Sequence, residues 1–244
     1  MRHVMITGAS SGIGAATARL LAGPDTVLSL GARRAERLPE VVEGAFCHRL
    51  DVTDESSVEA FLAAATQANG PVDVLVNNAG LARGVEPIAG ADGVAWREMI
   101  ETNVFGVLHM TRRVLPQMVE RGSGHVVMIG SVAGLVTYEG ASVYCATKRA
   151  LNAITEAIRL ETHGTGIRVT SVNPGLTETE FSLVRFRGDA ERAKVPYAGT
   201  RPLHAEDIAE CVAFAVSRPP HVNIDSLLVL ATDQSTPTRI HRRG

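Results

Sequence analysis

The stretch His3-Val4-Met5-Ile6-Thr7-Gly8-Ala9-Ser10-Ser11-Gly12-Ile13-Gly14 decides the fold of this chain. A short apolar run typical of a β-strand leads directly into a glycine-rich turn, and a helical pattern follows. The glycines allow a tight turn and close approach of a ligand, and the start of the helix offers unpaired N–H groups with a partial positive charge. Such a turn can be purely structural, but its place after the first strand of a βαβ unit favours a diphosphate site. We therefore expect a nucleotide to contact Gly8, Ser10, Ser11, Gly12, Ile13 and Gly14.

Outward from this turn, short apolar runs alternate with longer helical patterns along the 244 residues. Runs such as Val126–Ile129 are continuously apolar, as in parallel strands that are buried on both faces. The alternation predicts one doubly wound, Rossmann-type α/β domain over residues 1–244, with a seven-stranded parallel sheet and helices on both faces. The predicted strands are His3–Thr7, Thr26–Gly31, Ala45–Leu50, Val72–Asn77, His125–Ile129, Ile167–Asn173 and Ser226–Leu230. The predicted helices are Gly12–Ala22, Arg34–Val42, Glu55–Ala68, Ala95–Glu120, Val143–Thr162 and Ala205–Ser217. The stretch from Leu176 to about Leu203 is expected to be an irregular substrate loop.

Composition argues against several classes of function. The chain is 45% hydrophobic, enough for a substantial core, and its net charge of −2 gives no electrostatic reason to expect nucleic acid or an acidic membrane surface. No apolar run approaches the ~18 residues that span a bilayer, and the first apolar stretch is too short for a secretory signal. The scattered Cys47, Cys145 and Cys211 indicate neither a disulfide framework nor a metal site. We therefore expect a cytoplasmic protein without a metal.

The second predicted strand is followed by Ala32-Arg33-Arg34. A site that prefers NAD places Asp or Glu here to accept from the ribose 2′-hydroxyl, and this chain has no acidic residue between Gly31 and Glu36. Two guanidinium groups can instead bind the 2′-phosphate of NADP(H). A solvated basic pair is the alternative, although the dipole of the following helix disfavours cations at this place. The sequence therefore predicts NADP(H), with Arg33 as the main phosphate ligand and Arg34 assisting or stacking on the adenine.

Tyr144 and Lys148 are four residues apart on a predicted helix, which places them on one face. A free phenol titrates near pH ~10, and a neighbouring cation lowers its pKa by favouring the phenolate. The hydroxyl of Ser131, brought near, can hydrogen-bond an oxygen on which charge changes. Together these groups predict a proton-transfer site that interconverts an alcohol and a carbonyl. The alternative is an interfacial tyrosine beside a solvated lysine.

With these pieces together, the whole chain resembles the short-chain dehydrogenase/reductase family. The matching motifs, in chain order, are Thr7-Gly8-x-x-x-Gly12-Ile13-Gly14, Leu50-Asp51-Val52, Asn77-Asn78-Ala79-Gly80, Asn103, Ser131, Tyr144-x-x-x-Lys148 and Pro174-Gly175-x-x-x-Thr179. The resemblance implies that Tyr144 is the acid/base and that Ser131 holds the substrate oxygen. Lys148 would lower the pKa of Tyr144 and bind the nicotinamide ribose, and Asn103 would support a water between Lys148 and solvent.

The resemblance also implies the remaining cofactor contacts. Asp51 and Val52 would contact the adenine, and Asn78, Ala79 and Gly80 would pack their backbone against the adenosine side. The nicotinamide would be covered by Pro174, Gly175, Leu176 and Thr177, while Thr179 would reach the diphosphate. Family members usually form homotetramers through the helices predicted here at about 95–120 and 143–162, and a homodimer is the alternative.

Finer resemblances leave the substrate open between two classes. One is the NADP-dependent 3-hydroxy acid dehydrogenases, which are similar at Asn77–Ala82, Glu86-Pro87, Glu180–Ser182, Val184–Asp189, His221–Ile224 and His241-Arg242. The other is the reductases of antibiotic pathways, such as clavaldehyde reductase, which are similar at Asp207–Glu210 and Thr232–Gln234.

The two classes make different demands on the site. A 3-hydroxy acid needs a cation for its carboxylate, for which Arg185 is the first candidate and Arg187 and Arg83 are others. A pathway aldehyde or ketone needs none. A non-catalytic NADP-binding sensor or scaffold is a third alternative, because fold alone does not give function.

Overall fold

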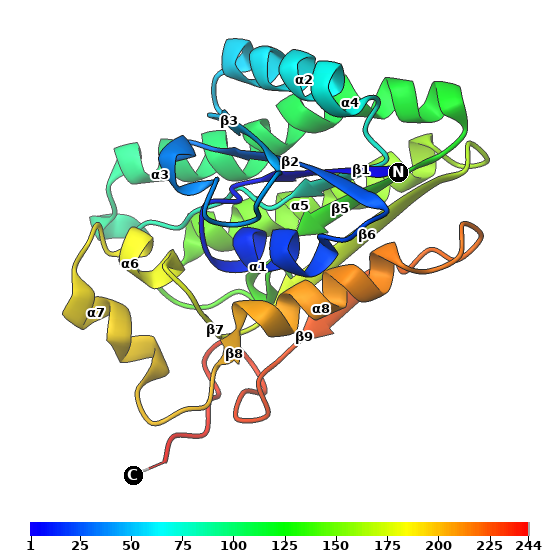
Figure 1. Ribbon diagram of the computed structural model, residues 1–244. Helices are drawn as coiled ribbons and strands as arrows, with labels where there is room; N and C mark the ends of the chain where they lie inside the picture. Colours follow the sequence, from blue (N-terminus) through cyan, green and yellow to red (C-terminus); the bar gives the residue numbers. More distant parts are fainter. Residues whose placement is uncertain (244) are drawn as a thin grey trace.

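The structure, a computed structural model that describes residues 1–243, is a parallel seven-stranded sheet between two layers of helices (Figure 1). The strand order is β3-β2-β1-β4-β5-β6-β9. From β1 the chain builds outward to β3, then crosses to β4 and builds in the other direction, so the loops after β1 and β4 diverge and leave a crevice at their carboxyl ends. The predicted doubly wound fold is confirmed. The strands are β1 (Arg2–Thr7), β2 (Thr26–Ala32), β3 (Phe46–Arg49), β4 (Val74–Asn77), β5 (Gly124–Ile129), β6 (Ile167–Pro174) and β9 (Ser226–Val229).

Each face of the sheet has its own apolar core. α1 (Gly12–Leu21) and α8 (Ala205–Val216) cover one face, and α2 (Glu55–Asn69), α4 (Gly106–Arg121) and α5 (Ser142–Glu161) cover the other. Side chains alternate along β1, so Val4 and Ile6 join the first core and Met5 joins the second. Burial on both faces is the physical reason for the continuous apolar runs in the strands.

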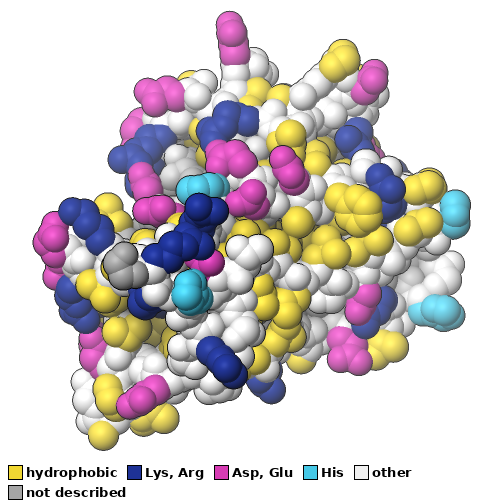
Figure 2. All heavy atoms as spheres, turned by 90° about the horizontal axis from the view of Figure 1, so that it is seen from below, with side chains coloured by type: hydrophobic (Ala, Val, Ile, Leu, Met, Phe, Trp, Pro, Cys, Tyr) yellow, Lys and Arg dark blue, Asp and Glu magenta, His cyan; other side chains and the backbone are white. Residues whose placement is uncertain are grey.

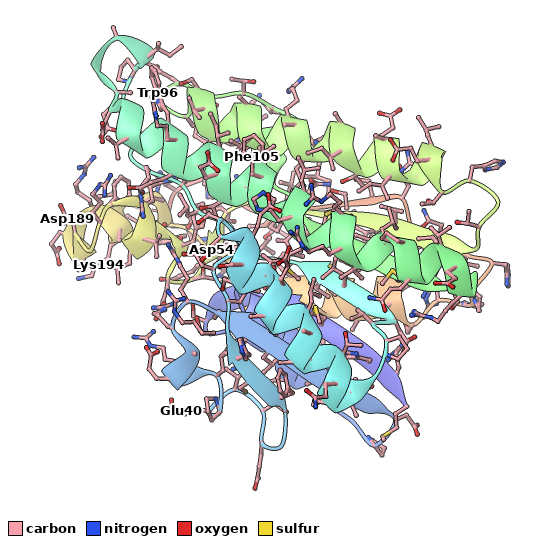
Figure 3. The ribbon with its side chains drawn as sticks, turned by 90° about the horizontal axis from the view of Figure 1, so that it is seen from above. Glu40, Asp54, Trp96, Phe105, Asp189 and Lys194 are labelled. Carbon is pink, nitrogen blue, oxygen red and sulfur yellow. The ribbon has the colours of Figure 1, made fainter. Side chains whose placement is uncertain are left out.

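The long middle helix is interrupted at one place. The predicted helix Ala95–Glu120 is α3 (Gly93–Ile100), a π-helical segment η3 (Glu101–Phe105) and α4, which together run as one rod in Figure 3, past the labelled Trp96 and Phe105. π-helical turns are rare and occur frequently at functional sites. This turn contains Asn103.

The predicted helix Arg34–Val42 was wrong. Only the short 3-10 turn η1 (Ala35–Arg37) forms there, and turns follow it as far as β3. Pro39 explains the difference, because it has no N–H to donate to a helical ladder.

The stretch from Leu176 to Leu203 is more ordered than expected. It contains β7 (Thr177–Glu178), α6 (Phe181–Arg185), α7 (Ala190–Lys194), η5 (Val195–Tyr197) and the start of β8 (Leu203–His204), and β7 pairs with β8 in parallel. α6 and α7 stand at one side of the sheet (Figure 1). Two further 3-10 turns are η2 (Ile88–Gly90) and η4 (Val132–Gly134). Among residues 1–243, no helix combines the length and apolar character required to cross a membrane.

Candidate active site

A cavity of about 700 Å³ lies at the carboxyl ends of the central strands. Its volume is in the range of ligand pockets, ~300–1,000 Å³, and its position is the crevice where the strand order reverses. Most of the predicted site residues line it: Gly8, Ser10, Ser11, Gly12, Ile13, Arg33, Arg34, Asp51, Val52, Asn78, Ala79, Gly80, Ser131, Tyr144, Lys148, Pro174, Gly175, Thr177 and Thr179. Arg83 and Arg187 also line it, whereas Gly14, Asn103, Leu176 and Arg185 do not.

The glycine-rich turn forms one wall of the cavity. Gly8 and Gly12 have φ angles of 66° and 54°, which favour glycine. The side-chain amide of Asn78 donates to the carbonyls of Thr7 (2.9 Å) and Gly8 (3.1 Å) and so fixes the turn from the end of β4. A Cβ on Gly14 would overlap this amide and the Gly8 carbonyl. The structure therefore gives Gly14 a packing role between α1 and the turn, and its expected ligand contact stays a prediction.

Arg33 and Arg34, at the end of β2, are in different electrostatic situations. Arg34 donates to the Ser11 hydroxyl (2.9 Å) and pairs with Glu180 (2.8 Å), whose other carboxylate oxygen is 3.0 Å from Arg37. Arg33 is exposed on the cavity wall and forms no ion pair with any residue that the structure describes. The Arg33 guanidinium is therefore available to pair with an anion of a ligand, whereas the Arg34 guanidinium is already bound to Glu180 and Ser11. Sequence reasoning did not assign Glu180 to the site.

Tyr144, Lys148 and Ser131 meet on the floor of the cavity. Tyr144 and Lys148 are one turn apart on α5, and Ser131 follows β5 and begins η4. All three are buried, with 7%, 6% and 9% of their surface exposed. The Lys148 ammonium donates to the Ile129 carbonyl at 2.9 Å, which directs it to the end of β5. The predicted trio is thus assembled beside the crevice.

Burial dominates the titration of these groups. Burial raises the pKa of Tyr144 to about 12, against the opposing effects of the Arg185 charge and of a hydrogen bond with Ser131. Burial also lowers the pKa of Lys148 to about 8. In this structure the Arg185 guanidinium, 5.1 Å from the ring centroid, is a cation that lowers the phenol pKa, and the expected effect of Lys148 stays a prediction. Near neutral pH the phenol is protonated and the ammonium is charged.

Asn103 does not line the cavity, but it hydrogen-bonds Leu81, which does. Its side chain accepts from the Leu81 N–H (2.8 Å) and donates to the Leu81 carbonyl (2.8 Å) and to the Thr147 hydroxyl (3.1 Å). A Cβ on Gly80 would lie 3.3 Å from Asn103 Oδ1 and 3.6 Å from Lys148 Nζ, so Gly80 sits between the two side chains. Asn103 therefore holds the segment after β4 that contains Gly80 and Leu81 beside Lys148. Its predicted support of a water stays a prediction.

A second cavity, of about 290 Å³, adjoins the first at Tyr144, Arg83 and Arg187, which line both. Arg185 lines only this second cavity, whose apolar wall includes Trp96, Met99, Val143 and Phe186. The structure therefore places Arg185 on the opposite side of Tyr144 from the glycine-rich turn.

The three arginine candidates for an anionic substrate differ in their partners. Arg83 pairs with Glu98, and Arg187 lies 3.6 Å from the same carboxylate. Arg185 has no ion pair within residues 1–243; its guanidinium stacks on Tyr144 and Phe181, and its Nη2 donates to the Tyr138 hydroxyl at 3.3 Å. Its buried Nε has no hydrogen-bond partner among these residues. Arg185 is therefore the candidate with donors free for an anion.

Comparison with known proteins gives matches over most of the chain. The family description "short chain dehydrogenase" matches residues 2–188. Sulfoacetaldehyde reductase 2 of Chromohalobacter salexigens is 42% identical over 95% of this chain and 95% of its own length. NADP-dependent 3-hydroxy acid dehydrogenase YdfG of Escherichia coli K12 is 41% identical over 98% of this chain and 99% of its own. The closed form of serine dehydrogenase, solved with NADP⁺, superposes with a TM-score of 0.93 at 40% identity and covers 99% of this chain and 100% of that one.

Proposed function

Because the chain belongs to the short-chain dehydrogenase family, we propose that it transfers a hydride between NADP(H) and a small alcohol or carbonyl compound. The observation that carries the proposal is the buried group of Tyr144, Lys148 and Ser131 on the floor of the main cavity. A proton donor in that position can give a proton to the substrate oxygen, or take one from it, as the hydride is transferred.

The main cavity fits NADP(H) in size, shape and charge. The glycine-rich turn and the start of α1 offer N–H groups to a diphosphate, and Arg33 offers a free guanidinium to a 2′-phosphate. The relatives named as NADP-dependent, and the serine dehydrogenase solved with NADP⁺, support this choice over NAD(H). When bound, the cofactor supplies the hydride chemistry, and the protein supplies binding, orientation and proton transfer.

The roles of the protein groups follow from their positions. In reduction, the protonated phenol of Tyr144 gives its proton to the substrate oxygen, and the Ser131 hydroxyl donates a hydrogen bond to the same oxygen. In oxidation the Tyr144 phenolate takes the proton of the substrate hydroxyl, and the Ser131 hydroxyl hydrogen-bonds the same oxygen. The positive charges of Arg185 and Lys148 favour the phenolate that remains after proton transfer. Burial of the trio keeps bulk water from the transferred proton.

A small 3-hydroxy acid is the substrate class that the site supports best. Arg185 is held by aromatic stacking beside Tyr144 and lines the second cavity, and its guanidinium, which has no ion pair within residues 1–243, suits a carboxylate. The relatives are named for a 3-hydroxy acid, for serine and for sulfoacetaldehyde, and each of these names denotes a compound with an anionic group. Arg185 would bind that group while the hydroxyl or carbonyl oxygen faces Tyr144.

A second candidate is an aldehyde or ketone of a secondary-metabolite pathway. The second cavity favours it, because about 290 Å³ of space beside Tyr144, partly lined by Trp96 and Met99, leaves room for a bulkier group. In that case the guanidinium of Arg185 would lower the pKa of Tyr144 and bind no part of the substrate.

For the whole molecule we infer a cytoplasmic homotetramer, or a homodimer. Two observations support association. Phe105 and Leu108, three residues apart on the middle helix, are 44% and 38% exposed and so place two neighbouring apolar side chains on the surface. Hydrophobic side chains also gather over the face with α8 and β9, which Figure 2 shows, and Phe214 and Leu228 belong to those elements. The three free cysteines fit a reducing compartment.

A substrate panel tests this function. NADPH oxidation is followed with 3-keto acids and bulkier aldehydes, and NADP⁺ reduction is followed with 3-hydroxy acids. The methyl ester of each acid is the matched control, because it keeps the reacting carbon and loses the anion. The proposal expects turnover with NADPH and NADP⁺ and a preference for the acid over its ester. Binding of NADPH without turnover of any compound would contradict it, and a preference for esters and bulky aldehydes would favour the second candidate.

A further inference from the structure

Gln234 is a buried polar residue near the C-terminus that has no part in the site described so far. It is 7% exposed and lies between α8 and the chain end, in the Thr232-Asp233-Gln234 sequence. Buried amides are retained where they satisfy a specific partner, because an unpaired polar group in the interior is costly. The partner of Gln234 therefore indicates its role.

That partner is the backbone immediately after the cavity wall. Gln234 Oε1 accepts a hydrogen bond from the Leu176 N–H at 2.7 Å. A Cβ on Gly175 would overlap the same oxygen, so the amide is seated directly on the Pro174-Gly175 turn that lines the main cavity. On its other sides this turn is held by the Gly175 N–H, which donates to Val229 (2.7 Å), and by the Leu176 carbonyl, which accepts from Leu203 (2.9 Å).

The residues next to Gln234 hold the far end of the same loop. Asp233 accepts from the Arg201 N–H at 2.9 Å and pairs with Arg243 at 2.8 Å. The Arg243 N–H in turn donates to the Gly199 carbonyl at 2.7 Å. The segment 233–243, here called the C-terminal clamp, therefore contacts both ends of the loop from Leu176 to Leu203.

We propose that Gln234 is a positioning residue for the nicotinamide half of the cofactor site, and that the C-terminal clamp sets the path of the substrate loop. The proposal rests on the proposed function, since it assumes that Pro174-Gly175 faces a nicotinamide. Loss of the amide oxygen leaves the Leu176 N–H without its acceptor, so the turn is held only by its hydrogen bonds to Val229 and Leu203 and can shift relative to the cavity. A shift of the order of 1 Å in a group that orients a reactant costs roughly a hundredfold in rate.

The test compares two ligands that share only the adenosine half of the cofactor. Dissociation constants are measured for NADPH by its fluorescence and for 2′,5′-ADP by calorimetry, in wild type, Gln234→Leu and Gln234→Glu. Gln234→Leu keeps the volume and removes the acceptor, whereas Gln234→Glu keeps an acceptor oxygen. Arg239→Ala is the matched control, because Arg239 is an exposed residue of the same clamp whose side chain forms no hydrogen bond or ion pair with the loop.

The expected result is that Gln234→Leu weakens NADPH roughly tenfold, the size of one unsatisfied hydrogen bond, and lowers kcat more than it raises the KM of the substrate. Binding of 2′,5′-ADP stays within about twofold in all variants, and Gln234→Glu and Arg239→Ala resemble wild type. Equal weakening of both ligands would overturn the proposal, because it would mean general loss of structure. Unchanged NADPH affinity and kcat in Gln234→Leu, or an equal loss in Gln234→Glu, would also overturn it. Wild-type binding and turnover test the proposed function separately.

Discussion

The different surroundings of Arg33 and Arg34 predict that replacing each arginine affects the cofactor differently. Arg33→Ala removes an unshared charge from the wall where a 2′-phosphate would bind. Two unit charges ~4 Å apart interact by about 1 kcal/mol in water and about 4 kcal/mol near a protein surface. Since Arg33 is exposed, an intermediate loss of about 2 kcal/mol is expected, which is about 30-fold in the KM for NADPH. NADH has no 2′-phosphate, so its KM should change by less than about twofold.

Arg34→Ala should behave otherwise. Arg34 already shares its charge with Glu180 and holds the Ser11 hydroxyl of the glycine-rich turn. Its loss should raise the KM values of NADPH and NADH by similar and smaller factors. Arg37→Ala is the matched control, because Arg37 binds the same carboxylate and does not line the cavity. Steady-state kinetics with both cofactors measures all three variants. If Arg33→Ala raised both KM values equally, or if Arg34→Ala changed the preference more, the assignment of the phosphate to Arg33 would be refuted.

Three further predictions concern charge and pH. Arg185→Ala should raise the KM of a 3-hydroxy acid by roughly ten- to a hundredfold and that of its methyl ester by less than about twofold; equal increases would remove Arg185 from carboxylate binding. The kcat/KM for NADPH reports the free enzyme, and it should fall as pH rises through about 8, where buried Lys148 loses its charge; a flat profile from pH 7 to 9 would count against this. Burial lowers the pKa of His125 to about 3, so the unfolded chain binds more protons below about pH 6.5 and stability falls there. From pH 7 to pH 5 this one group should cost about 2 kcal/mol, and urea unfolding of His125→Gln, which keeps a partner for Thr170, should lack that part of the loss.

The sheet could be predicted because its signal is local in the sequence. The central strands are apolar runs bounded by turn residues, and all seven predicted strands lie in one sheet. The helix expected at Arg34–Val42 failed because one residue, Pro39, outweighed the surrounding helical pattern. The short elements between Leu176 and Leu203 were missed because two to five residues carry no measurable periodicity.

The residues of the site were likewise predicted only where their signal is local in the sequence. The motif residues around Gly8, Asn78, Tyr144 and Gly175 were found because each sits at a strand end or on one helix face. Glu180 and Gln234 were not assigned roles, since their partners are fixed only by the folded chain: Arg37 is 143 residues from Glu180, and Leu176 is 58 residues from Gln234. Likewise, the sequence spacing pointed to Lys148 beside Tyr144 but did not show that α6 also brings Arg185 to the ring.

The central claim is that Tyr144 transfers the proton that accompanies hydride transfer, and Tyr144→Phe tests it most directly. This change removes only the hydroxyl and keeps the ring on which Arg185 stacks. NADPH oxidation with the best substrate of the panel should fall by roughly 10²–10⁴-fold, while the dissociation constant of NADPH should stay within about twofold. Turnover near the wild-type rate, with NADPH still bound, would contradict the account.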